Sequence, residues 1–484
     1  MERVRFAPSP TGPLHIGGVR TALFNYLYTK SLNGVFILRM EDTDQERFVD
    51  GAESYIIDSL QWLGLTIDEG PTTGGEYGPY RQSERKALYQ EFIEKLIANG
   101  KAYYAFDTKD ELDVLRKEAE AKGTSFKYSK ENREQLCNSL SLSIEETASY
   151  LEKGTYVVRL KNDAVGDIIV SDLLRGTIHV NAEEIDDKIL VKADGMPTYH
   201  FANVVDDHLM KISTVIRGEE WLPSLPLHQL IYDAFGWEAP RFVHLPLILK
   251  PEGKGKLSKR DGDKGGFPVF PLQWNENKGF KDKGFLPEGV VNYLALLGWN
   301  DGTDKEIFTL EELVKLFGLG GIQKGGARFD YSKAVWVNGQ QLQKLSTEKL
   351  ITLLQLDNDT NVHKRIDQIK ERANTIIDLK DMLRWYDTDP QEYDGNILQK
   401  IGSQSVADLM TTLDTYIRTH STLEKDDFKK MLDTLGIKMG IGMQSLRLAL
   451  FGSLVGPDLF EFMLLLDKDV ILRRIKRLEE TLKT

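Results

Sequence analysis

A histidine followed by two glycines stands near the start of the chain, where residues 8–18 read Pro-Ser-Pro-Thr-Gly-Pro-Leu-His-Ile-Gly-Gly. Residues 4–7 before this stretch are β-prone, and the prolines then forbid regular structure. The apolar residues that follow have the spacing of one helix face and are Val19, Ala22, Leu23, Tyr26 and Leu27. Gly17 and Gly18 therefore stand at a predicted helix N-terminus, which favours an anion. His15, beside that opening, can donate hydrogen bonds to a phosphate whose charge is growing.

A second stretch, residues 250–262, is glycine-rich and basic and includes Lys256, Ser258 and Lys259. Residues 241–249 before it are apolar enough to predict one strand that leads into a loop. Lysines are compact charges suited to phosphates, and glycines let a loop close over a ligand. Alone, the first stretch is typical of a turn and the second of a solvated loop. Their order, with α/β patterning between them, predicts one nucleoside triphosphate site.

Four further blocks complete a resemblance to a known family. They are residues 36–44 (Phe-Ile-Leu-Arg-Met-Glu-Asp-Thr-Asp), 78–85 (Gly-Pro-Tyr-Arg-Gln-Ser-Glu-Arg), 194–208 (Asp-Gly-Met-Pro-Thr-Tyr-His-Phe-Ala-Asn-Val-Val-Asp-Asp-His) and 215–221 (Val-Ile-Arg-Gly-Glu-Glu-Trp). With the two motifs they resemble the bacterial-type glutamyl-tRNA synthetases of class I. The resemblance implies glutamate–tRNA ligase activity: L-glutamate and ATP give glutamyl-adenylate and pyrophosphate, and the acyl group then passes to the 3′ end of tRNA-Glu. Magnesium is expected to accompany the ATP.

The resemblance also implies which residues form the site. The ATP residues would be His15, Gly17, Gly18, Lys256, Ser258 and Lys259. Of these, His15 with the helix N-terminus would serve the α-phosphate, and Lys259 assisted by Lys256 the β- and γ-phosphates. The glutamate residues would be Arg5, Ser9, Glu41, Tyr199, Asn203 and Arg217. This set suits the substrate, because each arginine can grip a carboxylate and Glu41 can hold the ammonium. Which arginine binds which carboxylate is left open.

Three positions depart from the general class I motifs. The first motif usually ends in a second histidine, where this chain has Gly18, and the second motif has Leu257 and Arg260 in place of methionine and serine. Glutamyl enzymes share these variants, and Lys259 is intact. What replaces the contact of the second histidine has no explanation from the sequence.

The resemblance implies a fold with a Rossmann-type α/β catalytic domain, an inserted domain that binds the tRNA acceptor end, and an all-α anticodon-binding region after them. The predicted boundaries are 1–106 and 191–285 for the two catalytic halves, 107–190 for the insertion, 286–335 for a linker and 336–484 for the helical region. Inside it, breaks are expected at residues 387–390 and 440–442, and Ser143 begins a possible capping box in the insertion. Some relatives bind zinc in the insertion, but this chain has Ala105, Phe106 and Asp107 there, so no zinc site is predicted.

The composition limits the kinds of metal site, cellular location and partner that the chain can have. The 484 residues carry a net charge of −12 and one cysteine, Cys137, which excludes intrachain disulfides and cysteine-rich zinc sites. No apolar run approaches the ~18 residues of a membrane span, and the N-terminus is no signal sequence, so we expect a cytoplasmic protein with no membrane partner. An acidic chain can still bind tRNA through a local basic face, for which the candidates are Arg447, the basic run at residues 473–477 and the lysines around residues 275–284. By its position in the resemblance, Arg372 is a candidate anticodon contact. The resemblance suggests a monomer.

Several alternatives compete with this interpretation. A non-discriminating enzyme would also charge tRNA-Gln. A short glutamyl-queuosine-type enzyme would lack the helical region, and a glutaminyl enzyme would carry β-barrels in its place. A small-molecule nucleotidyltransferase would need no such region, and an inactive RNA-binding protein would not need the intact Lys259 and glutamate pocket.

Overall fold

The computed structural model describes residues 1–402 and 404–483. The chain forms two units: residues 1–280 with 291–330, and residues 281–290 with 331–484. Because this division is coarser than the predicted five parts, the boundaries at 106/107, 190/191, 285/286 and 335/336 stay predictions. None of the described helices is both long and apolar enough to cross a membrane.

The first unit contains all the strands of the described chain. They are β1 (Arg3–Phe6), β2 (Val35–Leu38), β3 (Ala102–Ala105), β4 (Val157–Leu160), β5 (Asp167–Asp172), β6 (Gly176–Asn181), β7 (Ile189–Val191), β8 (Thr214–Gly218), β9 (Arg241–Leu245), β10 (Ile248–Leu249) and β11 (Ala327–Arg328). The parallel pairs are β1–β2, β8–β9 and β10–β11, and β5 joins β9 at Asp172–Phe242. The antiparallel pairs are β3–β4, β4–β7 and β5–β6.

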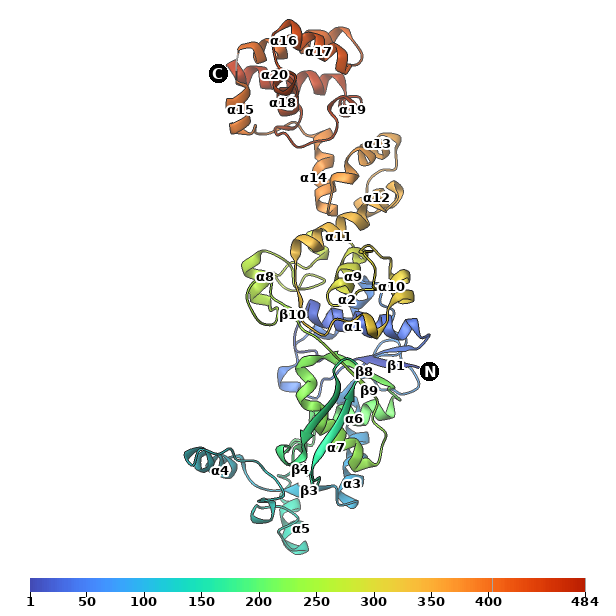
Figure 1. Ribbon diagram of the computed structural model, residues 1–484, viewed down its shortest axis with the longest axis vertical. Coiled ribbons are helices and arrows are strands. Elements are labelled where there is room, and N and C mark those ends of the chain that lie inside the picture. Colours follow the sequence, from blue (N-terminus) through green and yellow to red (C-terminus); the bar gives the residue numbers. More distant parts are fainter. Residues whose placement is uncertain (403, 484) are drawn as a thin grey trace. The chain divides into compact units, whose positions relative to one another are not determined.

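Strands β1 and β8 lie beside each other (Figure 1). The Ser213 N–H, just before β8, donates to the Arg3 carbonyl of β1 at 2.9 Å. The chain leaves β1 toward β2 on one side, and it leaves β8 toward β9 on the other. In open α/β sheets, ligands bind outside the carboxyl ends of strands where the strand order reverses in this way. The predicted Rossmann-type architecture is confirmed, and its crevice lies after Phe6 and Gly218.

Nine helices lie wholly in the described part of the first unit. They are α1 (Ile16–Ser31), α2 (Ala52–Trp62), α3 (Lys86–Ala98), α4 (Lys109–Ala121), α5 (Ile144–Glu152), α6 (Tyr199–Leu209), α7 (Leu225–Phe235), α8 (Lys259–Gly265) and α10 (Leu310–Leu316). Helix α9 (Pro287–Leu296) has residues in both units. The expected capping box is present at the start of α5, where the Ser143 hydroxyl accepts from Glu146 N. Apolar side chains of β8, α6 and α7 belong to one core, which includes Val215, Phe201 and Ile231.

Two local expectations need correction around residues 250–262, the basic stretch that is called the lysine loop below. Residues 241–249 form two strands, β9 and β10, which are separated by Pro246 and Leu247; β9 pairs with β8, and β10 pairs with β11. The stretch 250–262 is not loop throughout, since α8 begins at Lys259. The Ser258 hydroxyl and Asp261 form a capping box at this helix start, a signal present in the sequence.

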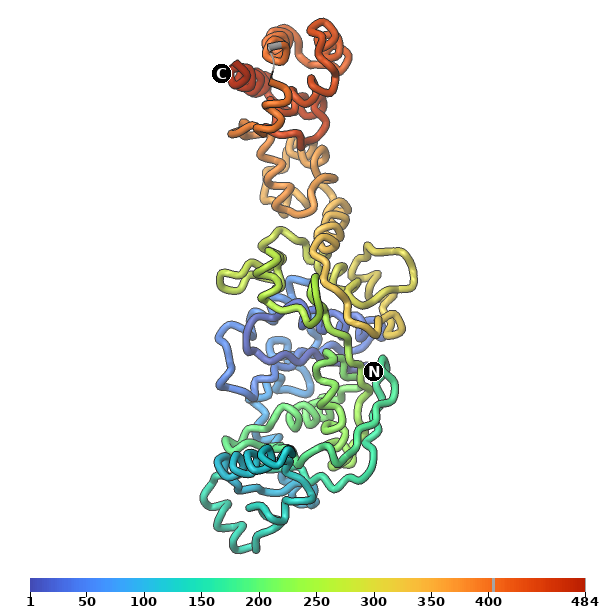
Figure 2. The backbone as a smooth tube through the Cα atoms, turned by 60° about the vertical axis from the view of Figure 1, so that its left-hand side comes forward, coloured from blue at the N-terminus to red at the C-terminus, as the bar shows by residue number. Residues whose placement is uncertain are grey.

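The described residues of the second unit form helices and connecting turns with no strand, as predicted, and Figure 2 shows the coiled backbone of its C-terminal part from orange to red. Its helices are α11 (Tyr331–Gln343), α12 (Thr347–Leu354), α13 (Thr360–Ile369), α14 (Ile376–Asp387), α15 (Gly395–Ile401), α16 (Gln404–Thr419), α17 (Lys425–Thr434), α18 (Met439–Phe451), α19 (Leu459–Met463) and α20 (Lys468–Lys483). The break after Asp387 is confirmed. The break predicted at 440–442 is wrong, because those residues lie inside α18 and the turn comes earlier, at Gly436 with φ +66°. A Cβ on Gly442 would meet Leu432 Cδ2 at 2.4 Å, so this glycine permits close packing of α17 on α18.

Candidate active site

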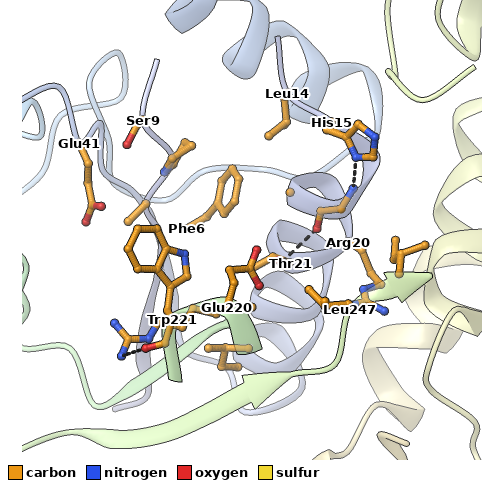
Figure 3. Close-up of a pocket in the computed structure, with 18 of the residues that line it drawn as sticks. Phe6, Ser9, Leu14, His15, Arg20, Thr21, Glu41, Glu220, Trp221 and Leu247 are labelled. Carbon is orange, nitrogen blue, oxygen red and sulfur yellow. Dashed lines mark hydrogen bonds between the residues drawn. The ribbon is translucent and has the colours of Figure 1, made fainter. Parts of the chain in front are cut away.

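A cavity of about 450 Å³ opens at the carboxyl ends of β1 and β8. It gathers most of the predicted site residues: Arg5, Ser9, His15, Gly17, Gly18, Glu41, Tyr199, Asn203, Arg217 and Lys256. In Figure 3, Ser9 and Glu41 lie on one side of this cavity and His15 on the other, with Glu220 and Trp221 between them. Residues separated by more than 200 positions therefore line one cavity.

The two ring nitrogens of His15 have different hydrogen-bonding roles. It is the N-cap of α1, and its Nδ1 accepts a hydrogen bond from the Gly17 N–H at 3.1 Å. An accepting Nδ1 places the proton of a neutral ring on Nε2. Nε2 is buried and has no hydrogen-bond partner among the described residues. Burial and then the charge of Lys256 lower the pKa of His15 from 6.5 to about 4, so the ring is neutral near pH 7. The ring therefore keeps one free N–H for a ligand.

Gly18 has a steric reason to lack a side chain. A Cβ at this position would lie 2.7 Å from Leu14 Cδ1. Leu14 is buried and lines the cavity, so a histidine at position 18 would have to displace it. Among the described residues, we find no side chain that takes over the role of the second histidine of the general motif.

Arg5 is held by a carboxylate that the sequence analysis did not identify. Its Nε and Nη2 donate to the two oxygens of Asp207 at 3.0 and 3.2 Å. Arg39 Nη1 also donates to Asp207, at 2.7 Å, and Arg39 Nη2 to Glu41 Oε1 at 3.1 Å. Asn203 Nδ2 donates to the same Glu41 oxygen at 2.9 Å. The fork of Arg5 is thus already paired, and only Nη1 has no partner among the described residues.

The pKa values in this buried network follow from the charges around each group. Burial acts to raise the pKa of Asp207, but the charges of Arg5 and Arg39 lower it. Burial raises the pKa of Glu41, against the opposing charges of Arg39 and Arg5. Helix α6 supplies Tyr199, Asn203 and Asp207 at a spacing of four residues, so one helix face delivers three groups to the site.

Arg217 has a different environment, with neutral acceptors. Its Nε donates to His244 Nε2 at 3.0 Å, and its Nη1 lies 3.2 Å from the Tyr199 hydroxyl and 3.4 Å from His228 Nδ1. Its Nη2 donates to the Trp221 carbonyl at 3.4 Å. No carboxylate of the described chain lies within ion-pair distance of this guanidinium, which is 5% exposed. Burial raises the pKa of Tyr199 to about 12, so its hydroxyl keeps its proton.

The lysine loop divides its residues between two neighbouring cavities. Lys256 Nζ lies 2.7 Å from Glu220 Oε1, and both side chains border the first cavity. Lys259 borders a second cavity, of about 460 Å³, which shares Ser9, His15 and Gly18 with the first. Ser258 borders neither cavity, because its hydroxyl donates to Asp261 in the cap of α8.

Residues 105–107, the stretch in which some relatives bind zinc, make hydrogen bonds and ring contacts with neighbouring residues. Asp107 accepts from the Cys137 N–H at 2.9 Å and from the Tyr128 hydroxyl at 2.8 Å. Phe106 stacks on Tyr150 with ring centroids 4.9 Å apart. The described residues contain no group of three or more His, Cys, Asp or Glu that could hold a metal ion. Absence of zinc stays a prediction, which metal analysis can test.

The two candidate tRNA contacts lie near each other in the second unit. Arg372 is exposed at the end of the short 3-10 helix Lys370–Arg372, and Arg447 is half-buried in α18. Burial and then the positive charge of Arg372 lower the pKa of Arg447. The Arg447 Nη1 donates to the Gly456 carbonyl at 3.1 Å. Two residues 75 positions apart thus form one small basic area.

The sequence analysis missed the residues that hold the two arginines. These are Asp207, which Arg39 also binds, at Arg5, and His228, His244 and Trp221 at Arg217. A signal was present, because charged residues inside apolar strand patterns need buried partners. Arg39, Asp207 and Trp221 also stand inside the blocks that carry the resemblance. Nothing in the sequence said which partner belongs to which arginine.

Comparisons with known proteins agree with this geometry. A family model described as tRNA synthetases class I (E and Q), catalytic domain, matches residues 2–336, and one described as an anticodon binding domain matches residues 340–478. A glutamate–tRNA ligase of Christiangramia forsetii is 49% identical over 99% of both chains, and one of Flavobacterium johnsoniae is 50% identical over 98% of both. The crystal structure of a glutamate tRNA ligase from Elizabethkingia meningosepticum, in complex with its amino acid, has a TM-score of 0.93 at 46% identity and 99% coverage of both chains.

Proposed function

Because the chain belongs to the class I tRNA synthetases for glutamate and glutamine, we propose that its cavity joins glutamate to tRNA in two ATP-dependent steps. The activity is that of a glutamate–tRNA ligase. The observation that carries it is one cavity with a buried, uncompensated guanidinium at Arg217, a carboxylate at Glu41 and the free Nε2 proton of His15. These groups match the charges of glutamate and a phosphate.

In the first step, a carboxylate oxygen of glutamate attacks the α-phosphorus of ATP. The bond from this phosphorus to the bridging oxygen breaks, and pyrophosphate leaves. His15 donates its Nε2 proton as a hydrogen bond to an α-phosphate oxygen, and the N-terminus of α1 adds its dipole. Glu41 receives the substrate ammonium, whose charge favours the ionised carboxylate against the effect of burial. The chain's contribution is positioning and charge stabilisation.

The lysines of the loop serve the β- and γ-phosphates. Support comes from Lys259 beside the cavity that shares His15 and Gly18 with the first, and from Lys256 across the first cavity. ATP would release Lys256 from Glu220 by offering a denser negative charge. Since no cluster of metal-binding side chains occurs in the described chain, Mg²⁺ would be held mainly by the phosphates and water.

In the second step, the terminal ribose hydroxyl of tRNA attacks the carbonyl carbon of the adenylate, and AMP leaves. The anticodon-binding region supports tRNA as the acceptor. We propose that Arg372 and Arg447 contact its phosphates or bases. The relatives described above are named for glutamate, so the non-discriminating alternative has no support. A tRNA ligase acts where tRNA is used, which favours the cytoplasm, and a monomer stays our expectation.

The test is pyrophosphate exchange into ATP with glutamate and with glutamine, each with and without tRNA. We expect exchange with glutamate in the presence of tRNA. Exchange with glutamine alone, or none under any condition, would contradict the proposal. Lys259→Ala should reduce exchange by two or more orders of magnitude while tRNA still binds, whereas Lys264→Ala, in the same short helix, should not.

The tRNA contacts need a separate measurement. Arg372→Ala and Arg447→Ala should each raise the KM for tRNA and lower the slope of log affinity against log salt by about 1. Arg384→Ala removes an exposed arginine of α14 and is the matched control. Equal effects of all three substitutions would reject a specific role for the basic area.

A further inference from the structure

Two histidines hold the guanidinium of Arg217 inside the first unit. His244 lies in β9, beside Arg217 in β8, and the two residues are register partners. His228 lies in α7 and approaches Nη1 from the other side, at 3.4 Å. The exposed fraction is 0% for His244 and 1% for His228. Neither histidine borders the cavity, so neither contacts the substrate directly.

The hydrogen bonds around His244 fix where its proton lies. Asp172 Oδ2 lies 2.7 Å from His244 Nδ1 and 3.0 Å from the His244 backbone N–H. Burial acts to raise the pKa of Asp172, but hydrogen bonds from His244 and the backbone lower it, so the carboxylate is ionised and can only accept. Nδ1 must then carry the proton. The lone pair of Nε2 therefore faces Arg217 and accepts its Nε–H.

The position of the ring proton of His228 follows in the same way from its hydrogen-bond partners. Because its Nδ1 faces the Nη1 donor of Arg217, the ring proton belongs on Nε2, which lies 3.1 Å from His200 Nδ1. Burial, followed by the charge of Arg217, lowers the pKa of His228 well below its usual value. Burial also lowers the pKa of His244, against the effect of Asp172. Both rings are therefore neutral acceptors.

This arrangement differs from the one at Arg5. Asp207 binds Arg5 through two oxygens and compensates its charge inside the protein. The imidazoles orient Arg217 without compensating its charge, and the carboxylate behind them, Asp172, contacts His244 and not the guanidinium. A buried cation kept in this state is costly until a ligand carboxylate arrives.

We propose that His244, oriented by Asp172, and His228 are positioning residues that hold Arg217 through neutral acceptors and so maintain the preference for glutamate over glutamine. The inference rests on the proposed function and takes Arg217, the arginine without a protein carboxylate, as the group that binds the side-chain carboxylate of glutamate. A substrate carboxylate pairs with the uncompensated cation, and a neutral amide does not. An acceptor that is lost or misplaced lets the guanidinium turn away from the cavity.

Two substitutions at His244 distinguish the loss of the hydrogen-bond acceptor from a change in side-chain volume. Glutamine places a carbonyl oxygen near the position of Nε2 and can still accept from Arg217. Asparagine reaches only the position of Nδ1, so it can bond Asp172 but leaves the Arg217 Nε–H without its acceptor. We expect His244→Asn to raise the KM for glutamate about tenfold to a hundredfold, the range for a lost hydrogen bond to a charged group. His244→Gln should stay within about threefold of wild type.

The readouts are kcat and KM for glutamate, KM for ATP and inhibition by glutamine, all by pyrophosphate exchange with tRNA present. We expect the asparagine variant to change the KM for glutamate and its advantage over glutamine, with kcat and the KM for ATP nearly unchanged. His208→Asn is the matched control, since His208 stacks on Trp237 and does not contact Arg217. Equal KM values for the two His244 variants would overturn the proposal.

A second pair of variants keeps the proposal testable if position 244 tolerates no change. His228→Asn retains an acceptor near Nδ1, whereas His228→Leu retains volume without one. The leucine variant should show the larger rise in KM for glutamate, and the reverse order would overturn the proposal. Failure of the wild-type chain to activate glutamate would instead reject the proposed function, which separates the two conclusions.

Discussion

Replacement of His15 by asparagine separates the two tasks that the structure gives to one imidazole. Nδ1 accepts from the Gly17 N–H and caps α1, while Nε2 carries the proton that faces no partner in the described chain. The asparagine side-chain oxygen can occupy the place of Nδ1 and is among the strongest N-caps. It offers no donor at the position of Nε2. His15→Ala removes both groups.

The expected magnitudes follow from this division. Loss of an N-cap costs about 0.5–2 kcal/mol of stability, so His15→Ala should destabilise the catalytic unit by about 1 kcal/mol. His15→Asn keeps the cap and should remain within about 0.5 kcal/mol of the wild type. Loss of one preorganised donor to developing charge costs about 10²–10³ in kcat, which both variants should show.

The assay combines pyrophosphate exchange with urea unfolding followed by tryptophan fluorescence. His179→Asn, on the exposed strand β6, is the control for a histidine-to-asparagine change. Because the pKa of His15 is about 4, the exchange rate of the wild type should also show no titration of this ring between pH 5.5 and 8. Exchange by His15→Asn within threefold of wild type would refute the assignment of Nε2 to the α-phosphate. Equal destabilisation by asparagine and alanine would refute the cap.

Three further predictions concern the other buried groups. Asp207→Asn removes the carboxylate that binds Arg5 and should destabilise the catalytic unit by about 3–5 kcal/mol, measured by the urea midpoint; a loss below 1 kcal/mol would contradict it. Tyr199→Phe removes a neutral acceptor of Arg217 and should raise the KM for glutamate about threefold to tenfold with kcat nearly constant, whereas an unchanged KM would exclude this contact. Burial lowers the pKa of His200 to about 4 from 6.5, so the unfolded chain binds the extra proton between these values. Stability should therefore fall as the pH drops from 6.5 to 4, by up to about 1.4 kcal/mol per pH unit from this residue, and His200→Gln should reduce the slope measured by urea unfolding at several pH values.

Much of the local structure could be read from the sequence, because its causes lie within a few residues. The glycines after His15, the capping residue Ser143 and the apolar helix face of residues 19–27 each act on their own segment. The same local reasoning failed at Gly442. A glycine can break a helix or admit a close neighbour, and the neighbour here is Leu432 of another helix.

The sequence alone determined the kind of chemistry: a helix opening with a hydrogen-bond donor at His15, a lysine loop and two arginines suited to a dicarboxylate. Only the tertiary structure decided how those charges are used. It paired Arg5 with Asp207, 202 residues away, and placed Arg217 among neutral histidines. The reason is physical: side-chain type fixes the charge a group can carry, but packing fixes its partners, and the partners decide which charge remains for a substrate.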